Sequence, residues 1–286
     1  MKESVVKIVL LLFILATVIL HMTGCGSKTA QDAVGRKGVQ EASNLVIRLE
    51  GGDWGFPSPF AHYSRGPGAS KMRLIYDSLL EKGEEGLIPW LAKSWSVSTD
   101  GKEYTFVLNS GVKWHDGKIL TAEDVKFSFE YFLEHPPVSN TLLIDGKPFI
   151  EMIEVLNENQ VKIVVNEPNA TVLDRLGIVR IIPKHIWESI DDPKKMMDID
   201  KLVGCGPYVL THYSQEQGAY RFQAFQDYWG PKPLVDTLEF VPVSDPILAF
   251  EKGEIDLINV PQDLMERYLN HSEYKILKSP AFWGYK

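Results

Sequence analysis

Cysteine and long apolar runs are the scarcest features of this sequence. Only two cysteines, Cys25 and Cys205, occur among 286 residues, so a disulfide framework cannot hold the chain together. After residue 24, no uncharged run approaches the roughly 20 residues that a membrane-spanning helix needs. We therefore expect a hydrophobic core to stabilise the body of the protein, and 44% hydrophobic residues supply the material for one.

An excess of positive charge is also absent. The chain carries 38 acidic against 30 basic residues, a formal net charge of −8, and no basic stripe runs along it. Proteins that bind nucleic acid usually concentrate lysine and arginine on one face or along one helix. The balance of charge argues against a nucleic-acid partner.

Motifs for catalysis and for metal binding are missing as well. No nucleophile elbow, phosphate-cradling loop or paired acid–base constellation occurs, and turn and helix-cap roles account for Asp116, Glu123 and Asp124. The six histidines after residue 24 do not fall at H-x-H or H-E-x-x-H spacing: His62, His115, His135, His185, His212 and His271. We expect no catalytic site, no cofactor and no metal site, and a protein that is not an enzyme.

The N-terminus has the pattern of a targeting segment. Lys2 and Lys7 precede an uncharged run of 13 residues, 8–20, which is shorter than the roughly 20 residues that span a bilayer. Met22-Thr23-Gly24-Cys25 follows and resembles a bacterial lipobox. We predict a lipoprotein signal peptide over residues 1–24, lipidation of Cys25, and a flexible tether over 25–43, where residues are small and polar. The alternative is an ordinary secreted protein with a stray cysteine.

Residues 91–129 are the most informative stretch of the chain. Asp100-Gly101 is a turn signal between two extended runs, and the second run places Tyr104, Phe106 and Leu108 on one face of a strand. Thr121 and Asp124 then have the spacing of a capping box, followed by apolar residues at helical spacing. The pattern predicts a hairpin, a turn and a capped amphipathic helix. Its aromatic residues (Trp95, Phe106, Trp114, Phe127 and Phe129) are interpreted as core rather than as an aromatic binding box.

Simple periodicity predicts the remaining elements. We expect a helix over 71–80, polar turns over 81–85, a surface loop over 135–149, a short helix over 170–176 and a loosely helical segment over 191–202. Strands are expected at 44–49, 208–212, 220–225 and 237–243, a second hairpin at 150–165, and a helix at 246–252.

Three motifs together resemble a known family. Residues 91–129 are similar to the signature of the extracellular solute-binding proteins (family 5) that serve peptide, dipeptide and nickel ABC importers. Gly204-Cys205-Gly206-Pro207-Tyr208 resembles that family's G-T-G-P-Y, with Cys205 in place of threonine. Residues 253–257 resemble its G-E-I-D motif, and the likeness extends over residues 44–286.

The resemblance implies a fold and a division into domains. The fold is α/β, of the periplasmic-binding-protein type (type II, with an extra inserted domain). Residues 44–81 and 204–286 are expected to form a discontinuous first lobe, and residues 82–203 an inserted α+β domain. The likeness reaches only the front part of the family pattern, so we expect the C-terminal lobe to be missing, as in a fragment or split gene. Such a chain would expose apolar surface and bind its ligand weakly.

The resemblance also indicates a ligand-binding segment. In the peptide-binding relatives, residues just before the first helix line the cleft and offer backbone groups to an extended ligand. Here those positions are Tyr63, Ser64, Arg65 and Gly66, and Arg65 could meet a carboxylate in a two-pronged contact. The alternative is an ordinary surface loop.

The implied function is solute capture for transport. We expect a lipid-anchored solute-binding component of an ABC importer, outside the cytoplasm on the outer face of the membrane or in the periplasm. It would deliver short peptides, or a related solute such as a nickel complex, to permease subunits. The alternatives are a surface peptide-sensing or interaction lipoprotein and a non-functional truncated remnant.

Overall fold

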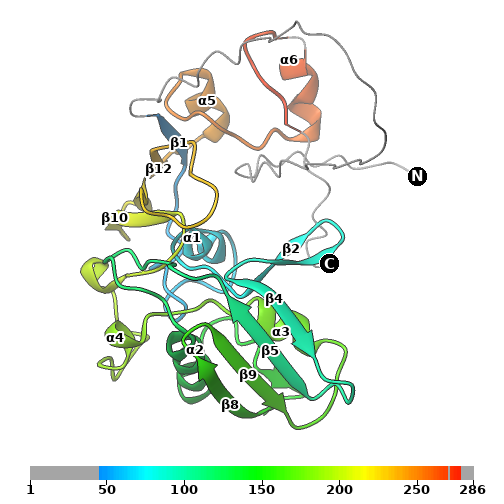
Figure 1. Ribbon diagram of the computed structural model, residues 1–286. Coiled ribbons are helices and arrows are strands. Elements are labelled where there is room, and N and C mark those ends of the chain that lie inside the picture. The colour runs from blue at the N-terminus through cyan, green and yellow to red at the C-terminus, as the bar shows by residue number, and fades with distance from the viewer. Residues whose placement is uncertain (1–44, 270, 278–286) are drawn as a thin grey trace, which may run out of the picture.

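The computed structural model describes residues 45–269 and 271–277. The predicted signal peptide, the tether and the lipidation site Cys25 lie outside these residues. Within them, none of the helices is long and apolar enough to cross a membrane. The described chain consists of two four-stranded sheets, two small hairpins and short helices (Figure 1).

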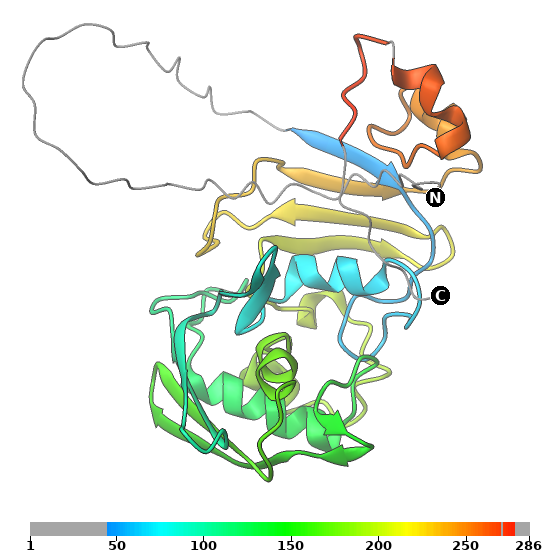
Figure 2. The same ribbon diagram turned by 90° about the vertical axis from the view of Figure 1, so that its right-hand side faces the viewer.

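The first sheet joins segments that are far apart in the sequence. Its strand order is β1 (Val46–Glu50), β12 (Thr237–Val241), β11 (Ala219–Ala224) and β10 (Tyr208–Ser214). β1 runs parallel to β12, and the other neighbours are antiparallel. Helix α1 (Gly68–Ile75) lies against one face of this sheet (Figure 2).

The free edge of β1 is held by a segment near the end of the described chain. The guanidinium of Arg48 donates to both carboxylate oxygens of Asp256, at 3.2 and 3.0 Å, and the Arg48 backbone N–H donates to the same group at 2.7 Å. Asp256 belongs to the 253–257 motif that the sequence singled out. This motif therefore ties helix α5 (Pro246–Glu251) and the segment after it to the first strand.

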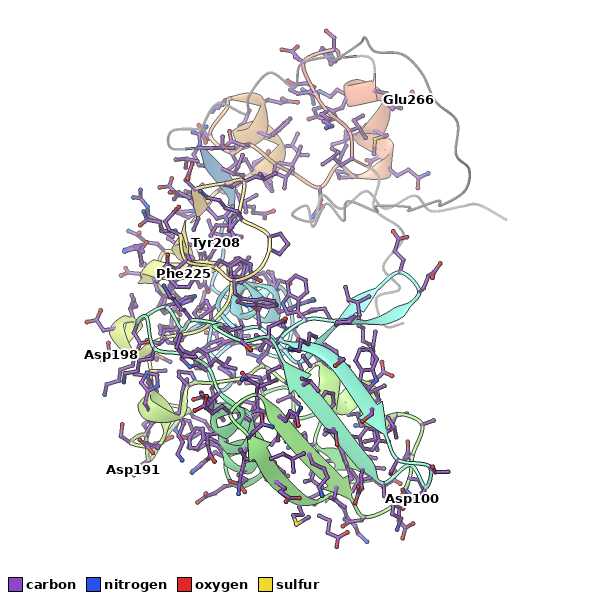
Figure 3. All side chains as sticks on the ribbon, in the orientation of Figure 1. Asp100, Asp191, Asp198, Tyr208, Phe225 and Glu266 are labelled. Atoms are coloured by element: carbon purple, nitrogen blue, oxygen red, sulfur yellow. The ribbon has the colours of Figure 1, made fainter. Side chains whose placement is uncertain are left out.

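The second sheet is antiparallel and contains the predicted hairpins. Its order is β4 (Ala92–Val97), β5 (Glu103–Leu108), β9 (Gln160–Val165) and β8 (Ile150–Asn157), with α2 (Ala122–Glu134) packed on one face (Figure 2). The alternation predicted for β5 is confirmed, since Tyr104, Phe106 and Leu108 are all buried. Asp100 lies at the far tip of the β4–β5 hairpin, remote from Tyr208 in the first sheet (Figure 3).

Helix α2 begins where the sequence predicted. The Asp124 carboxylate accepts the backbone N–H of Thr121 at 2.9 Å, which completes the capping box. Its other oxygen accepts the Lys184 backbone N–H at 3.0 Å, so the cap also holds α4 (Lys184–Trp187). The interpretation of the aromatic residues as core is confirmed: Phe106, Trp114 and Phe129 are buried, and Trp95 and Phe127 pack against the same core cluster.

Two predictions about the segment after the first loop were wrong. The helix spans Gly68–Ile75 rather than 71–80, because Tyr76 adopts extended backbone angles (φ −118°, ψ 129°) and Leu80 pairs with Pro89 in a hairpin. Strands β2 (Leu80–Gly83) and β3 (Gly86–Pro89) make up that hairpin, where only a polar turn was expected. Backbone pairing in the β2–β3 hairpin thus ends the helix earlier than the apolar spacing of residues 71–80 predicted.

The other elements are short. The expected surface loop contains the small hairpin β6 (Leu143–Ile144) and β7 (Lys147–Pro148), and α3 (Val172–Gly177) follows the second sheet. The segment 191–202 is mostly turns, with one short 3-10 helix, Ile199–Lys201. Gln262–Leu264 and α6 (Met265–Leu269) pack with α5 in a small apolar cluster apart from the main core.

His115 joins the two sheets. Its backbone N–H donates to the Gly204 carbonyl at 2.8 Å, its Nε2 lies 3.0 Å from the Gly206 carbonyl oxygen, and the Gly204 N–H donates to its Nδ1 at 3.2 Å. A Cβ on Gly204 would lie 1.9 Å from the carbonyl oxygen of Ile75, so only glycine fits there. We call this set of hydrogen bonds between His115 and residues 204–206 the His115 clasp. It requires the Gly-x-Gly sequence and a neutral imidazole that donates from one nitrogen and accepts at the other.

Candidate functional site

A cavity of about 280 Å³ lies where α1, α2 and the β2–β3 hairpin meet. Apolar residues from several elements form one part of its wall: Pro59, Ala69, Met72, Phe132, Pro137, Leu142, Ile178 and Val179. Polar residues complete it: His62, Arg73, Glu81, Lys82, Ser139, Asn140, Thr141 and Arg180. Apolar walls with a few converging polar groups are typical of small-molecule sites.

Backbone and side-chain hydrogen bonds fix the loops that form this wall. The Val138 N–H donates to the Pro59 carbonyl at 3.0 Å, so the 137–142 segment lies beside the chain that precedes α1. Thr141 Oγ1 donates to the Arg175 carbonyl at 3.1 Å, and the Arg175 guanidinium donates to the Leu143 carbonyl at 2.9 Å. Hydrogen bonds therefore fix the loops that form the cavity wall.

One side of the cavity carries a compact charge cluster. Arg180 Nη1 donates to Glu81 and, at 3.3 Å, to the Tyr76 carbonyl, while Arg73 Nη2 donates to Glu81 at 2.8 Å. The Arg180 and Glu81 side chains are 10% and 16% exposed. Burial by itself would raise the pKa of Glu81, but the two arginines hold it below its ordinary value. Lys82 also lines the cavity, so its wall carries three cationic side chains and one carboxylate, a balance that favours an anionic group.

A buried carboxyl group, that of Asp77, lies close to this charge cluster. Asp77 accepts hydrogen bonds from Trp229 Nε1 at 2.9 Å and from the Tyr228 hydroxyl at 3.2 Å. Burial raises the pKa of Asp77 to about 6, against the lowering effect of its tryptophan partners and of Arg180. The Asp77 carbonyl also accepts the Ile181 N–H at 2.9 Å, which fixes the strand segment that carries Arg180.

The predicted ligand-binding residues lie beside the cavity rather than in its wall. Tyr63, Ser64, Arg65 and Gly66 are all exposed, and the neighbouring residue that lines the cavity is His62. The Tyr63 hydroxyl donates to Asp53 at 2.7 Å. Although burial would raise it, this bond and those from Gly55 and Gln215 keep the pKa of Asp53 below its ordinary value. The role of these four residues in ligand binding stays a prediction.

Gly66 constrains the shape of that loop. Gly66 has φ +84°, in the left-handed region, and a Cβ there would lie 2.2 Å from the ring of Trp54. The Trp54 N–H in turn donates to the Tyr220 hydroxyl at 2.9 Å. The loop before α1 is therefore fastened to the first sheet.

Sequence reasoning missed the residues that form the cavity. Arg180 and Glu81 are 99 positions apart in the chain, and neither belongs to a recognisable motif. A lone arginine between apolar residues and a glutamate in a polar turn carry no local signal. They come together because Arg180 pairs with Ser78 in an antiparallel bridge, beside the start of β2 that carries Glu81.

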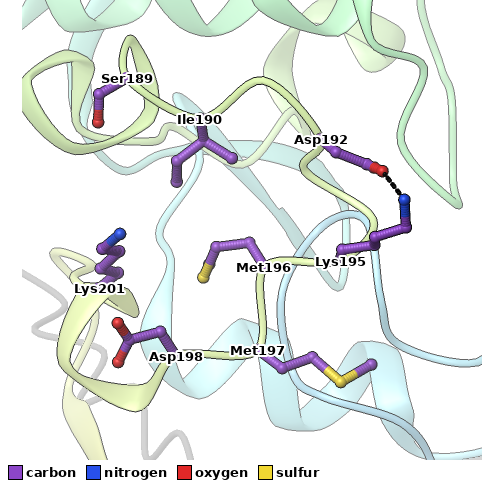
Figure 4. Close-up of a pocket in the computed structure, with 8 residues that line it drawn as sticks. All are labelled: Ser189, Ile190, Asp192, Lys195, Met196, Met197, Asp198 and Lys201. Atoms are coloured by element: carbon purple, nitrogen blue, oxygen red, sulfur yellow. Dashed lines mark ion pairs between the residues drawn. The ribbon is translucent and has the colours of Figure 1, made fainter.

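A second hollow lies on the turns between α4 and the 3-10 helix. Ile190, Met196 and Asp198 point toward one another there, and Met197 points away (Figure 4). Asp192 and Lys195 form an ion pair of 2.8 Å at its edge, and their side chains are 48% and 85% exposed. An exposed pair of this kind contributes little to stability or recognition. We therefore regard the cavity beside α1 as the stronger site.

Side chains of the types that bind metals, and Cys205, also lie within residues 45–269 and 271–277. No group of three or more histidine, cysteine, aspartate or glutamate side chains there is arranged to hold a metal ion. Cys205 is a free, buried thiol, and burial raises its pKa well above the ordinary value.

Comparison with known proteins gives the cavity a context. Residues 86–285 match the family described as bacterial extracellular solute-binding proteins, family 5 Middle. The chain is 34% identical over 234 residues to the dipeptide-binding protein of Escherichia coli (strain K12), an alignment that covers 74% of this chain and 43% of that protein.

Solved structures of solute-binding proteins are also similar to this chain. NikZ from Campylobacter jejuni, in complex with Ni(L-His), is similar with a TM-score of 0.65 and 28% identity, over 80% of this chain and 45% of that one. The periplasmic binding protein DppA from Helicobacter pylori, in complex with the peptide STSA, has a TM-score of 0.63 and 26% identity, over 79% and 48% of the two chains. The chain thus spans a little under half the length of these relatives.

Proposed function

Because this chain belongs to the bacterial extracellular solute-binding proteins of family 5 and has their α/β, periplasmic-binding-protein type of fold, we propose that it captures a solute for an ABC importer. The solute is a short peptide or a related small molecule such as a nickel complex. The chain acts by binding rather than by catalysis, and permease subunits are its partners.

The observation that carries this proposal is the cavity beside α1. Its apolar wall, formed by residues such as Met72 and Phe132, suits an aliphatic or aromatic side chain of a solute. Arg180 is largely buried, and its hydrogen bonds to Glu81 and to the Tyr76 carbonyl both use Nη1 among the residues that the structure describes. The guanidinium thus keeps donors for a solute carboxylate, and such charge-assisted contacts are strong.

The loop of Tyr63, Ser64, Arg65 and Gly66 forms the second part of the proposed site. It follows His62 directly, so it borders the cavity on the side where α1 begins. Its backbone groups would pair with an extended ligand, and Arg65 would contact a carboxylate. Binding through backbone groups would make the protein tolerant of ligand sequence.

The proposed location is outside the cytoplasm. Extracellular solute-binding proteins work on that side of the membrane, and the N-terminal pattern that ends at Cys25 would anchor the chain through a lipid.

Calorimetric titration tests the proposal. The purified chain is titrated with leucyl-leucine and, separately, with a nickel–histidine complex; we expect saturable binding of one of them. Arg180→Gln should weaken that binding about 10-fold or more, because a charge-assisted contact is lost. Lys195→Gln, at the second hollow, is the matched control and should leave affinity unchanged. No binding of either solute, or equal effects of the two substitutions, would contradict the proposal.

A further inference from the structure

His62 is a buried histidine in the wall of the cavity with one ring nitrogen unpaired. The residue is 3% exposed, its Nδ1 lies 2.9 Å from the Tyr63 carbonyl oxygen, and it is one of the residues that line the cavity. Its Nε2 is buried and has no hydrogen-bond partner among the described residues. Buried side-chain nitrogens are paired in most proteins, so a buried nitrogen without a partner in a cavity wall is a candidate contact for a bound solute.

The hydrogen bond at Nδ1 fixes the tautomer of the neutral ring. A carbonyl oxygen can only accept, so Nδ1 carries the proton and Nε2 of the neutral ring presents a lone pair. The backbone around it is held, because the Tyr63 N–H donates to the Trp54 carbonyl at 2.9 Å and the His62 N–H to the Ser58 carbonyl at 3.4 Å. His62 is a fixed acceptor rather than an adaptable group.

We infer that Nε2 of His62 determines specificity by accepting a hydrogen bond from an uncharged N–H group of the solute, such as the amide of a peptide bond. This inference rests on the proposed function and deepens it. Arg73, Lys82 and Arg180 outnumber Glu81 around the same cavity, and their charge disfavours a solute ammonium at this position.

The apolar surroundings make one acceptor effective. Ala69, Met72 and Phe132 line the cavity with His62, so a donor that enters loses its water there and needs a protein partner. A site built to pair with a solute donor rejects an analogue that lacks it far better than an apolar pocket rejects an extra methyl group. His62 would thus separate peptides from amide-free molecules of similar size.

A solute pair that differs in one hydrogen tests the inference. Leucyl-leucine and its analogue methylated on the peptide nitrogen are titrated against the wild-type chain, His62→Phe, and His212→Phe as an exposed control on β10. We expect the wild type and the control to prefer leucyl-leucine by roughly 10-fold or more. His62→Phe should bind both molecules with equal affinity.

Nitrogen-15 NMR of histidine side chains in the wild-type chain gives a second readout that does not depend on how a variant folds. The Nε2 resonance of His62 should move when leucyl-leucine saturates the chain and stay in place with the methylated analogue. Binding of leucyl-leucine with an unmoved Nε2 signal, or retained discrimination in His62→Phe, would overturn the inference and leave the proposed function intact. Absence of leucyl-leucine binding to the wild type would overturn the inference; if the nickel–histidine complex also fails to bind, the proposed function falls with it.

Discussion

At the scale of single residues, burial sets the charge of the groups that hold this chain together. His115 is enclosed between the Gly204 and Gly206 backbone groups, and burial lowers its pKa to about 4 despite the favourable Gly206 carbonyl. Asp77 shows the opposite shift, to about 6, for the same reason. In both cases the low-polarity interior favours the neutral form of the side chain.

The clasp at His115 predicts a loss of stability in acid. The unfolded chain binds a proton near the ordinary value of 6.5 and the folded chain only near 4, so stability falls as the pH drops between these values. The loss attributable to His115 is about 2–3 kcal/mol at the lower end. Asp77 opposes it, because its raised pKa adds stability as the pH falls through 6.

Comparison of the wild type with His115→Gln isolates this effect. Urea unfolding of both chains at neutral pH and near pH 4.5 should show the wild type losing its advantage over the variant as the pH falls. Glutamine can still donate and accept but does not titrate. A difference in unfolding free energy that stays constant with pH would rule out the clasp as the source.

At the scale of elements, α1 is the piece on which both the first sheet and the cavity depend. One side of it carries Met72 and Arg73 at the cavity, and Lys71 is directed to the sheet. The Nζ of Lys71 lies 4.1 Å from the centre of the Phe240 ring and 4.8 Å from that of Tyr220. The helix thus meets the sheet through a cation placed on aromatic rings.

Lys71 is predicted to cost stability at neutral pH. The residue is 2% exposed, and burial lowers its pKa to about 8 although Glu50 acts to raise it. Because the unfolded chain holds the proton more tightly, stability contributed at this site rises with pH between about 8 and 10.5. Lys71→Met keeps the length of the side chain and removes the charge, so it should raise the unfolding free energy by roughly 1–3 kcal/mol at pH 7.

Thermal unfolding at pH 7 and at pH 9.5 measures this effect. The gain from Lys71→Met should be larger at the lower pH, where the wild-type lysine is charged. Lys93→Met, on the exposed side of β4, serves as the control and should change little. A destabilised Lys71→Met chain would mean that the contacts of the cation with the two rings outweigh its burial.

At the scale of the whole molecule, two sheets are joined by chain segments that cross between them more than once. β1 begins the first sheet, the chain then builds the second sheet, and it returns through Gly204, Cys205 and Gly206 to complete the first. The division into a first lobe of 44–81 and 204–286 and an inserted domain of 82–203 stays a prediction. The main apolar core runs through both sheets without interruption.

Attachment to the membrane is the prediction that concerns the molecule as a whole. If Cys25 is lipidated, the body is held at the membrane surface through residues 25–43. Cys25→Ser should then shift the protein from the membrane fraction to the soluble fraction or leave the precursor uncleaved. Fractionation of cells and the mass of the purified chain report both outcomes, with Cys205→Ser as the control. Unchanged fractionation and mass in Cys25→Ser would exclude the anchor.

The sequence by itself determined the local elements and the family, because those depend on short-range patterns. The β4–β5 hairpin, the capping box of Thr121 and Asp124, and the alternation of Tyr104 and Phe106 follow from turn chemistry, hydrogen bonds over three positions and strand period. The family motifs lie within single stretches of chain for the same reason. The tertiary structure decided everything that depends on distant partners. Helix α1 ends at Ile75 because Leu80 pairs in a hairpin, and the Arg180–Glu81 pair and the unpaired Nε2 of His62 come together only when separate loops pack around one cavity.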